Sequence, residues 1–105
     1  MKIIVKKAGQ MPEVKEVENE LRVFNEIVGG YIETVSVIDN IFCVCNEEGK
    51  LKGLPMNMFL NGELIVGDVF FCAFEGEDFV SLEDYQIEAI MISLIKIEEY
   101  WRNIQ

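Results

Sequence analysis

The sequence predicts a small α+β domain: a mostly antiparallel sheet of five to six strands, one short helix and one long C-terminal helix. Short apolar runs, several alternating with polar residues, recur between turn signals along most of the chain. Two segments change instead to the three- and four-residue spacing of an amphipathic helix. With 105 residues, the chain is expected to form a single domain over residues 1–105.

The first part of the chain predicts a hairpin followed by a short helix. Residues 2–6 are a β-branched run, and residues 13–18 alternate between polar and apolar, so the two segments are expected to pair. Residues 21–28 carry the helical spacing. The turn chemistry around Gly9 and Pro12 supports the hairpin connection.

The middle of the chain predicts a second hairpin and two further strands. Residues 31–37 alternate and residues 41–45 are apolar throughout, with a tight-turn signal between them. Residues 46–60 read as an irregular connection ending at an Asn-Gly turn. Strands are then expected at 64–67 and 68–74, followed by an acidic turn at 75–78.

Side chains and glycines suited to helix ends set the expected boundaries. Asn19 is expected to be the N-cap of the short helix and Ser81 that of the long one. Gly29 or Gly30 is expected to end the short helix in the left-handed region.

The C-terminal helix is expected to run from about residue 81 to about residue 102. Its apolar residues spread over roughly 160° of the helix surface, and Ile92 lies outside even that wide stripe. Such a helix either crosses the whole sheet or packs against a second copy, so we expect a homodimer or higher homo-oligomer formed through it. Glu98 and Glu99 are expected to be solvated.

The formal charge of −10 bears on possible partners. It argues against direct nucleic-acid binding, which requires a basic face, and against anionic membrane surfaces. An acidic surface either keeps the chain soluble or imitates nucleic acid toward a basic partner. The apolar runs are far shorter than a membrane span, and the N-terminus does not resemble a signal peptide, so a cytoplasmic location is expected.

The residue types present give little support for an enzyme. The chain has no histidine, which removes the commonest general base and zinc ligand. Cys43 and Cys45 are expected to point to opposite faces of their strand, and with Cys72 to be small buried thiols. No catalytic residue, metal ligand or cofactor is therefore expected.

The stretch Asn46–Asn57, "NEEGKLKGLPMN", is the best candidate for a ligand-binding site. Lysine donates charged hydrogen bonds to phosphate, and asparagine offers both donors and acceptors to a base or ribose. Tyr31 and Glu33 are expected to share a strand face and to complete a pocket opposite this stretch, or else to be ordinary surface. The candidate ligand-binding residues are Tyr31, Glu33, Asn46, Glu47, Lys50, Lys52, Asn57 and Phe59. The alternative is a polar surface loop with a few apolar anchors.

The order "VGGYIE", "NEEGKLKGLPMN", "IVGDVFF" and "SLED" resembles the domain-of-unknown-function 3846 family. Its members are small proteins common in phages, plasmids and integrative elements, mostly of Gram-positive bacteria. The residues that fit the family pattern are Gly29, Gly30, Tyr31, Glu33, Asn46, Glu47, Gly49, Lys50, Leu54, Pro55, Asn57 and Gly67.

The resemblance implies an accessory protein of a phage or mobile element, of a kind that often blunts host defence. The first expectation is a non-enzymatic protein that binds and sequesters a nucleotide immune signal, such as a cyclic ADP-ribose isomer or a cyclic dinucleotide. Lys50 or Lys52 would then meet phosphate, and Tyr31 or Phe59 would stack on a base. The alternatives are an acidic inhibitor or decoy that binds a host defence protein, and an enzyme that degrades a signal.

Overall fold

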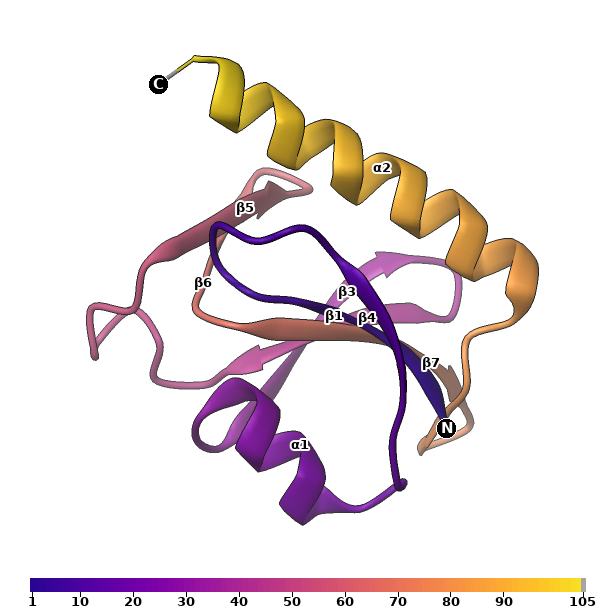
Figure 1. The fold of residues 1–105 in the computed structure, drawn as a ribbon. Helices are drawn as coiled ribbons and strands as arrows, with labels where there is room; N and C mark the ends of the chain where they lie inside the picture. Colours follow the sequence, from indigo (N-terminus) through magenta and orange to yellow (C-terminus); the bar gives the residue numbers. More distant parts are fainter. Residues whose placement is uncertain (105) are drawn as a thin grey trace.

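A computed structural model describes residues 1–104, which form one antiparallel sheet with a helix on each face, plus a separate two-stranded hairpin (Figure 1). This confirms the predicted fold class. The elements in chain order are β1 (Lys2–Lys6), β2 (Glu13–Glu16), α1 (Leu21–Val28), β3 (Ile32–Ile38), β4 (Ile41–Asn46), β5 (Met56–Leu60), β6 (Glu63–Val66), β7 (Val69–Glu75), β8 (Asp78–Val80) and α2 (Asp84–Asn103).

The main sheet has six strands in the order β2-β1-β7-β4-β3, with β8 pairing with the end of β7. Every pairing in it is antiparallel. The N-terminal strand β1 therefore lies inside the sheet, between β2 and a strand more than 60 residues later in the chain. Strands β5 and β6 form their own antiparallel hairpin.

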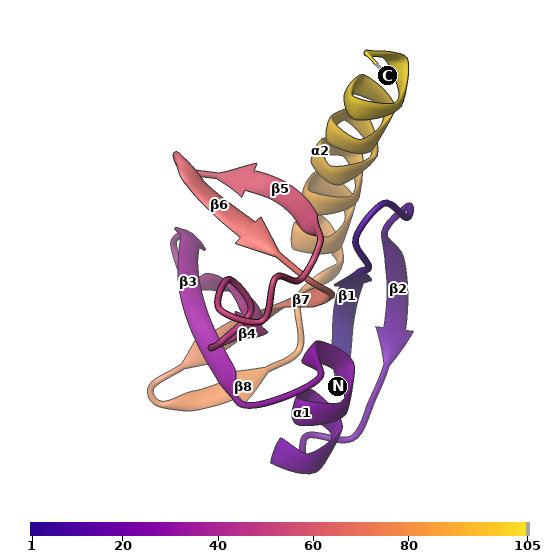
Figure 2. The ribbon, with the colours of Figure 1, turned by 90° about the vertical axis from the view of Figure 1, so that its left-hand side faces the viewer.

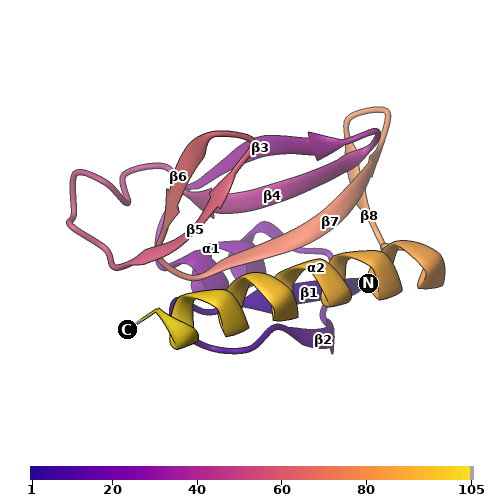
Figure 3. The same ribbon diagram turned by 90° about the horizontal axis from the view of Figure 1, so that it is seen from above.

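Each face of the sheet carries its own apolar cluster. Alternate residues of the central strand β7 point to opposite faces, with Phe71 in one cluster and Phe70 in the other. The cluster with Phe70 is covered by α1, and the cluster with Phe71 by α2 and the β5–β6 hairpin. Figure 3 shows α2 running across its face of the sheet beside that hairpin.

Several local expectations were wrong. Strand β5 lies in a segment expected to be irregular, and β8 begins where only a turn was expected. Glu20, not Asn19, is the N-cap residue of α1, and Glu83, not Ser81, is that of α2. The Glu83 side chain forms a reciprocal capping box with Gln86, whereas the Ser81 hydroxyl accepts a hydrogen bond from the Lys2 amide.

The expected stop of α1 is confirmed, since Gly29 has a φ of 77° and its amide donates to the carbonyl of Asn25. Neither helix of residues 1–104 is long and apolar enough to cross a membrane.

Candidate functional site

The connection between β4 and β5, residues 47–55, is a packed structure instead of a loose loop (Figure 2). Its backbone turns back on itself, with the amide of Lys52 donating to the carbonyl of Glu48 and that of Leu54 donating to Gly49. Leu54 lies over Gly67, where an added Cβ would be only 2.8 Å from its Cδ1 atom. The connection is therefore held against the end of β6.

Asn46 ties this connection to the end of α1. Its side chain is buried, with Nδ2 donating to the carbonyl of Val28 at 3.2 Å and Oδ1 accepting from the amide of Glu48 at 2.8 Å. A Cβ on Gly30 would lie 2.9 Å from that Nδ2 atom. The "VGGY" and "NEEGK" segments are thus in contact, and Asn46 is occupied in joining them.

Asn57 is also occupied inside the protein. Its Nδ2 donates to the carbonyls of Lys6 and Gly67, both at 2.8 Å, and its Oδ1 accepts from Lys6 Nζ at 3.1 Å. The same Lys6 ammonium is fully buried and forms an ion pair of 2.8 Å with Glu98. The expectation that Glu98 is solvated was therefore wrong, because only 5% of this residue is exposed.

Lys6 and Glu98 were not predicted as a functional or structural pair. The available signal was weak: Glu98 follows the buried Leu94 by four residues, which places both on one helix face. Nothing in the run Lys2–Lys6 distinguishes its last lysine as buried.

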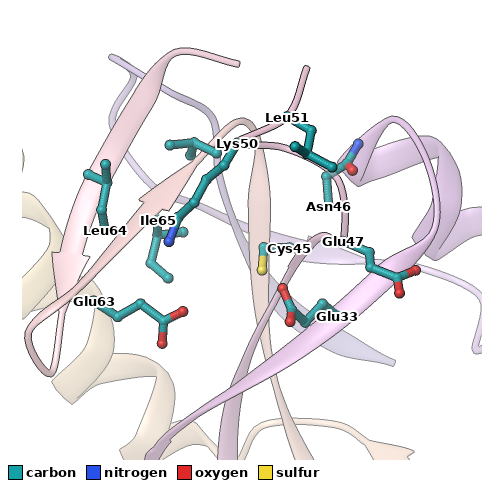
Figure 4. Close-up of a pocket in the computed structure, with 10 residues that line it drawn as sticks. Glu33, Cys45, Asn46, Glu47, Lys50, Leu51, Glu63, Leu64 and Ile65 are labelled. Atoms are coloured by element: carbon teal, nitrogen blue, oxygen red, sulfur yellow. The ribbon is translucent and has the colours of Figure 1, made fainter. Parts of the chain in front are cut away.

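The largest group of predicted residues lines one small cavity, the acidic cavity, of about 240 Å³ (Figure 4). Glu33 of β3, Glu47 of the connection and Glu63 of β6 line it, and Lys50 extends across it, while the Glu47 carboxylate points outward at its edge. Asn46 contributes to the wall. Three carboxylates to one lysine make this cavity unfavourable for a phosphate.

The cysteines are unsuited to nucleophilic chemistry. Cys45 forms the floor of the acidic cavity, and burial, with smaller contributions from Glu33 and Glu63, raises the pKa of its thiol to about 11. Burial also raises the pKa of Cys72 to about 12 and that of Cys43 well above its usual value. All three thiols are therefore protonated at neutral pH, whereas the thiolate is the nucleophile.

The expected orientation of two cysteines was wrong. Cys43 and Cys45 both belong to the cluster under α2, because residues two apart on a strand share a face. Cys72 belongs to the opposite cluster. Within residues 1–104, no three His, Cys, Asp or Glu side chains are grouped so that they could hold a metal ion.

Tyr31 and Lys52 line a second hollow, the Tyr31 cleft, on the other side of the connection. It has a volume of about 490 Å³, and Arg22, Asn25 and Gly30 also line it. Tyr31 is 71% exposed. The Lys52 ammonium is over the Gly30 backbone, since a Cβ there would be 3.4 Å from its Nζ.

The charges of the Tyr31 cleft are balanced. Arg22 and Lys52 face Glu26 and Glu48, in a chain whose formal charge is −10. The ion pairs of Arg22 with Glu20 and Glu26 raise the pKa of its guanidinium. The Asn25 Oδ1 atom is buried and has no hydrogen-bond partner among residues 1–104.

The structure thus divides the predicted set. Glu33, Glu47 and Lys50 line the acidic cavity, while Tyr31 and Lys52 line the Tyr31 cleft. Tyr31 and Glu33 do not share one pocket, because Tyr31 precedes β3 and its alternation. Phe59 lies elsewhere, with its ring centroid 6.3 Å from that of Trp101 on α2. Arg22 and Asn25 were not predicted, and only their place on the exposed side of α1 could have indicated them.

The protein is a small antiparallel α+β domain, and both hollows lie beside the β4–β5 connection. The chain belongs to the family described as Domain of unknown function (DUF3846), whose sequence profile matches residues 1–95. This confirms the resemblance seen in the sequence. No curated protein and no solved structure matches the chain.

Proposed function

We propose that this protein binds a nucleotide-type small molecule in the Tyr31 cleft and sequesters it without chemical change. The observation that carries the proposal is the cleft itself: an open hollow of about 490 Å³ with an exposed aromatic ring and two cations. Small-molecule sites usually have volumes of about 300–1,000 Å³. The acidic cavity is smaller than that and more negative.

Each group of the cleft has a role in this proposal. Tyr31 stacks on the base, and Lys52 donates a charged hydrogen bond to phosphate. Asn25 also lines the cleft, and its side-chain NH2 group donates a hydrogen bond to the base or ribose. Arg22 supplies a second cation when its ion pair with Glu26 is replaced by an ion pair with the phosphate.

The biological setting of the proposal comes from the resemblance to phage and mobile-element proteins. A protein that holds a nucleotide immune signal tightly, in the cytoplasm of a bacterial host, removes that signal from its receptor. This role requires a binding site and no catalytic group. The raised thiol pKa values agree with it, because Cys43, Cys45 and Cys72 are not activated as nucleophiles at neutral pH.

The proposed assembly is a homodimer formed through the outer face of α2. Ile92 is 49% exposed near the middle of this helix, and Tyr100 continues an apolar stripe on the same side. Glu88 and Lys96 each lie four residues from Ile92, in opposite directions. In an antiparallel two-fold pair centred on Ile92, each Glu88 is therefore level with the partner's Lys96.

The test of the binding proposal is thermal melting against a panel of nucleotides, including cyclic ADP-ribose isomers and cyclic dinucleotides. A ligand at about 100 times its Kd adds about 2.7 kcal/mol to the stability of the folded state. That is a rise of several degrees for a domain of this size. Chromatography of the recovered ligand should show it unchanged.

Matched variants locate the site. Lys52→Ala and Tyr31→Ala should each weaken binding about tenfold or more, as expected for the loss of a charged hydrogen bond or a stacked base. Lys50→Ala is the control, because Lys50 is in the same connection but faces the acidic cavity. Equal loss in Lys50→Ala and Lys52→Ala would contradict the assignment.

The second candidate function is an acidic inhibitor of a host defence protein. The net charge of −10 and the three glutamates around the acidic cavity favour it, because both attract a basic partner. A nucleotide panel without any thermal shift would favour this candidate. The next measurement would then be binding to basic host defence proteins, with Glu33→Gln and Glu63→Gln expected to weaken it.

A further inference from the structure

A third hollow lies between α2 and the sheet, away from both sites described above. This α2–sheet cleft has a volume of about 380 Å³ and is bounded by β3, β4, β5, β7 and one side of α2. Its walls are largely apolar, formed by Val37, Ile41, Leu60, Phe71, Ile90 and Leu94. It opens to solvent between Ile38 and Tyr85, both of which are more than half exposed.

The polar side chains in the cleft are few, and its two amide side chains, Gln86 and Asn40, are already occupied. Gln86 Nε2 donates to Asn40 Oδ1 at 3.2 Å, and Gln86 Oε1 accepts from the Glu83 amide. The side-chain Nδ2 atom of Asn40 donates to the backbone carbonyl of Phe74. These groups therefore have little capacity left to bind the head group of a polar ligand.

The single charged group that lines the cleft is the Asp39 carboxylate. It lies in the β3–β4 turn, where the chain adopts a left-handed conformation with a φ of 49°. A carboxylate there repels an anionic head group, and the net charge of −10 adds to that repulsion. An uncharged or cationic head group meets no such penalty.

We propose that the α2–sheet cleft is a binding site for an apolar small molecule that carries no negative charge. An apolar cavity of only about 150 Å³ in another protein binds benzene, so a cleft of this size and lining has room for a longer aliphatic or aromatic body. Binding is driven by the removal of apolar ligand and cleft surface from water. The site differs from the Tyr31 cleft in place and in ligand chemistry, so either proposal can fail alone.

The test uses 1-aminoanthracene, a neutral fluorescent probe, titrated into the full-length protein at neutral pH. Binding should raise and blue-shift its fluorescence. Decanol should displace the probe, whereas decanoate, with the same chain and an anionic head, should do so about tenfold less well. Equal displacement by both would contradict the selectivity assigned to Asp39.

Substitutions that fill the cleft locate the probe. Val37→Phe and Ala89→Phe each add a ring at its wall, from the sheet and from the helix, and should weaken probe binding about tenfold or more. Ser36→Phe is the control, since Ser36 is next to Val37 on the opposite face of β3. Two filling variants are used so that a folding defect in one of them does not remove the test.

Three results would overturn the proposal. The first is no fluorescence change with the wild-type protein, and the second is unchanged probe affinity in both filling variants. The third is probe affinity that falls as protein concentration rises, which would assign the cleft to a second copy of the chain.

Discussion

Lys6 is a cation held wholly inside the protein, and its surroundings explain how this is possible. The ammonium group has three acceptors, namely Glu98 Oε1 at 2.8 Å, the Lys7 carbonyl at 3.0 Å and Asn57 Oδ1 at 3.1 Å. Arg102 approaches the other Glu98 oxygen at 3.5 Å. An ammonium group has three protons to donate, so its hydrogen-bonding capacity is filled. The network joins β1, β5 and α2.

Removing one member of this ion pair should be far more damaging than removing both. Lys6→Met or Glu98→Leu alone leaves an unpaired buried charge, at an expected cost of about 3–5 kcal/mol in the free energy of unfolding. The double variant should recover most of that loss, because an apolar pair needs no compensating charge. Urea unfolding of the four proteins measures this, and additive losses would contradict it.

The residue scale is also where sequence interpretation reached its limit. Asparagine at positions 46 and 57 suits a ligand and a buried backbone partner equally well, and only the fold shows the second role. Lys50 and Lys52 are two residues apart in one connection, yet they face different hollows. The turn between them determines the direction of each side chain, and the spacing rules for helices and strands do not apply to such a turn.

Among the elements, the β4–β5 connection combines exposed charged side chains with a closely packed backbone. It packs so closely against the turn between β6 and β7 that no space is left for an added side-chain atom at Gly67. Gly67 has a φ of 77°, and an added Cβ would be 2.8 Å from Leu54 Cδ1. Gly53 has a similar φ of 67° but nothing within 4 Å. A comparison of the two glycines therefore distinguishes the cost of backbone strain from the cost of steric overlap.

Gly67→Ala should destabilise the protein more than Gly53→Ala does. Both variants incur the cost of a left-handed alanine, about 1–2 kcal/mol. Only Gly67→Ala also forces Leu54 to move, which should weaken the contact of the connection with β6. Thermal melting of both variants tests this. An equal decrease in Tm would show that the Leu54 contact does not contribute to the difference in stability.

Periodicity predicted the elements that have a clear period, and it failed where two signals conflict. The strands β3 and β4 and both helices were predicted near their observed bounds. Strand β5 was not, because Gly53 and Pro55 just before it are turn residues, and its register with β6 shifts between Met56 and Met58. Strand β8 is only three residues long and follows the acidic turn at Gly76.

At the scale of the whole molecule, the two faces of the sheet are covered unequally. The helix α1 is short and leaves the Tyr31 cleft at its end, whereas α2 has 20 residues and extends across its face. The wide apolar stripe on α2 predicted either a helix that crosses the sheet or one that packs against a second copy, and the structure shows α2 running across its face of the sheet. Ile92 remains outside that contact, on the outer face.

The proposed homodimer gives a prediction about mass in solution. Light scattering after size-exclusion chromatography should give twice the chain mass of 12.1 kDa for the wild-type protein and the monomer mass for Ile92→Glu. Leu21→Glu is the control, because Leu21 is 61% exposed on α1, which covers the opposite face of the sheet.

Charge exchange tests the orientation of the dimer. Lys96→Glu should weaken it through like-charge repulsion, and Glu88→Lys combined with Lys96→Glu should restore it. A monomeric wild-type protein at all concentrations would rule the dimer out.

The central place of β1 determines when the protein can fold during its synthesis. Strand β1 must wait for β7, which is synthesised more than 60 residues later, and its buried Lys6 must wait until Glu98 has been added. Until then the run Ile3–Val5 stays exposed, and exposed apolar strands are prone to aggregate. A chain interrupted before α2 therefore lacks both the cover of one sheet face and the counter-ion of Lys6. Synthesis of α2 thus becomes the step that commits this domain to its native state.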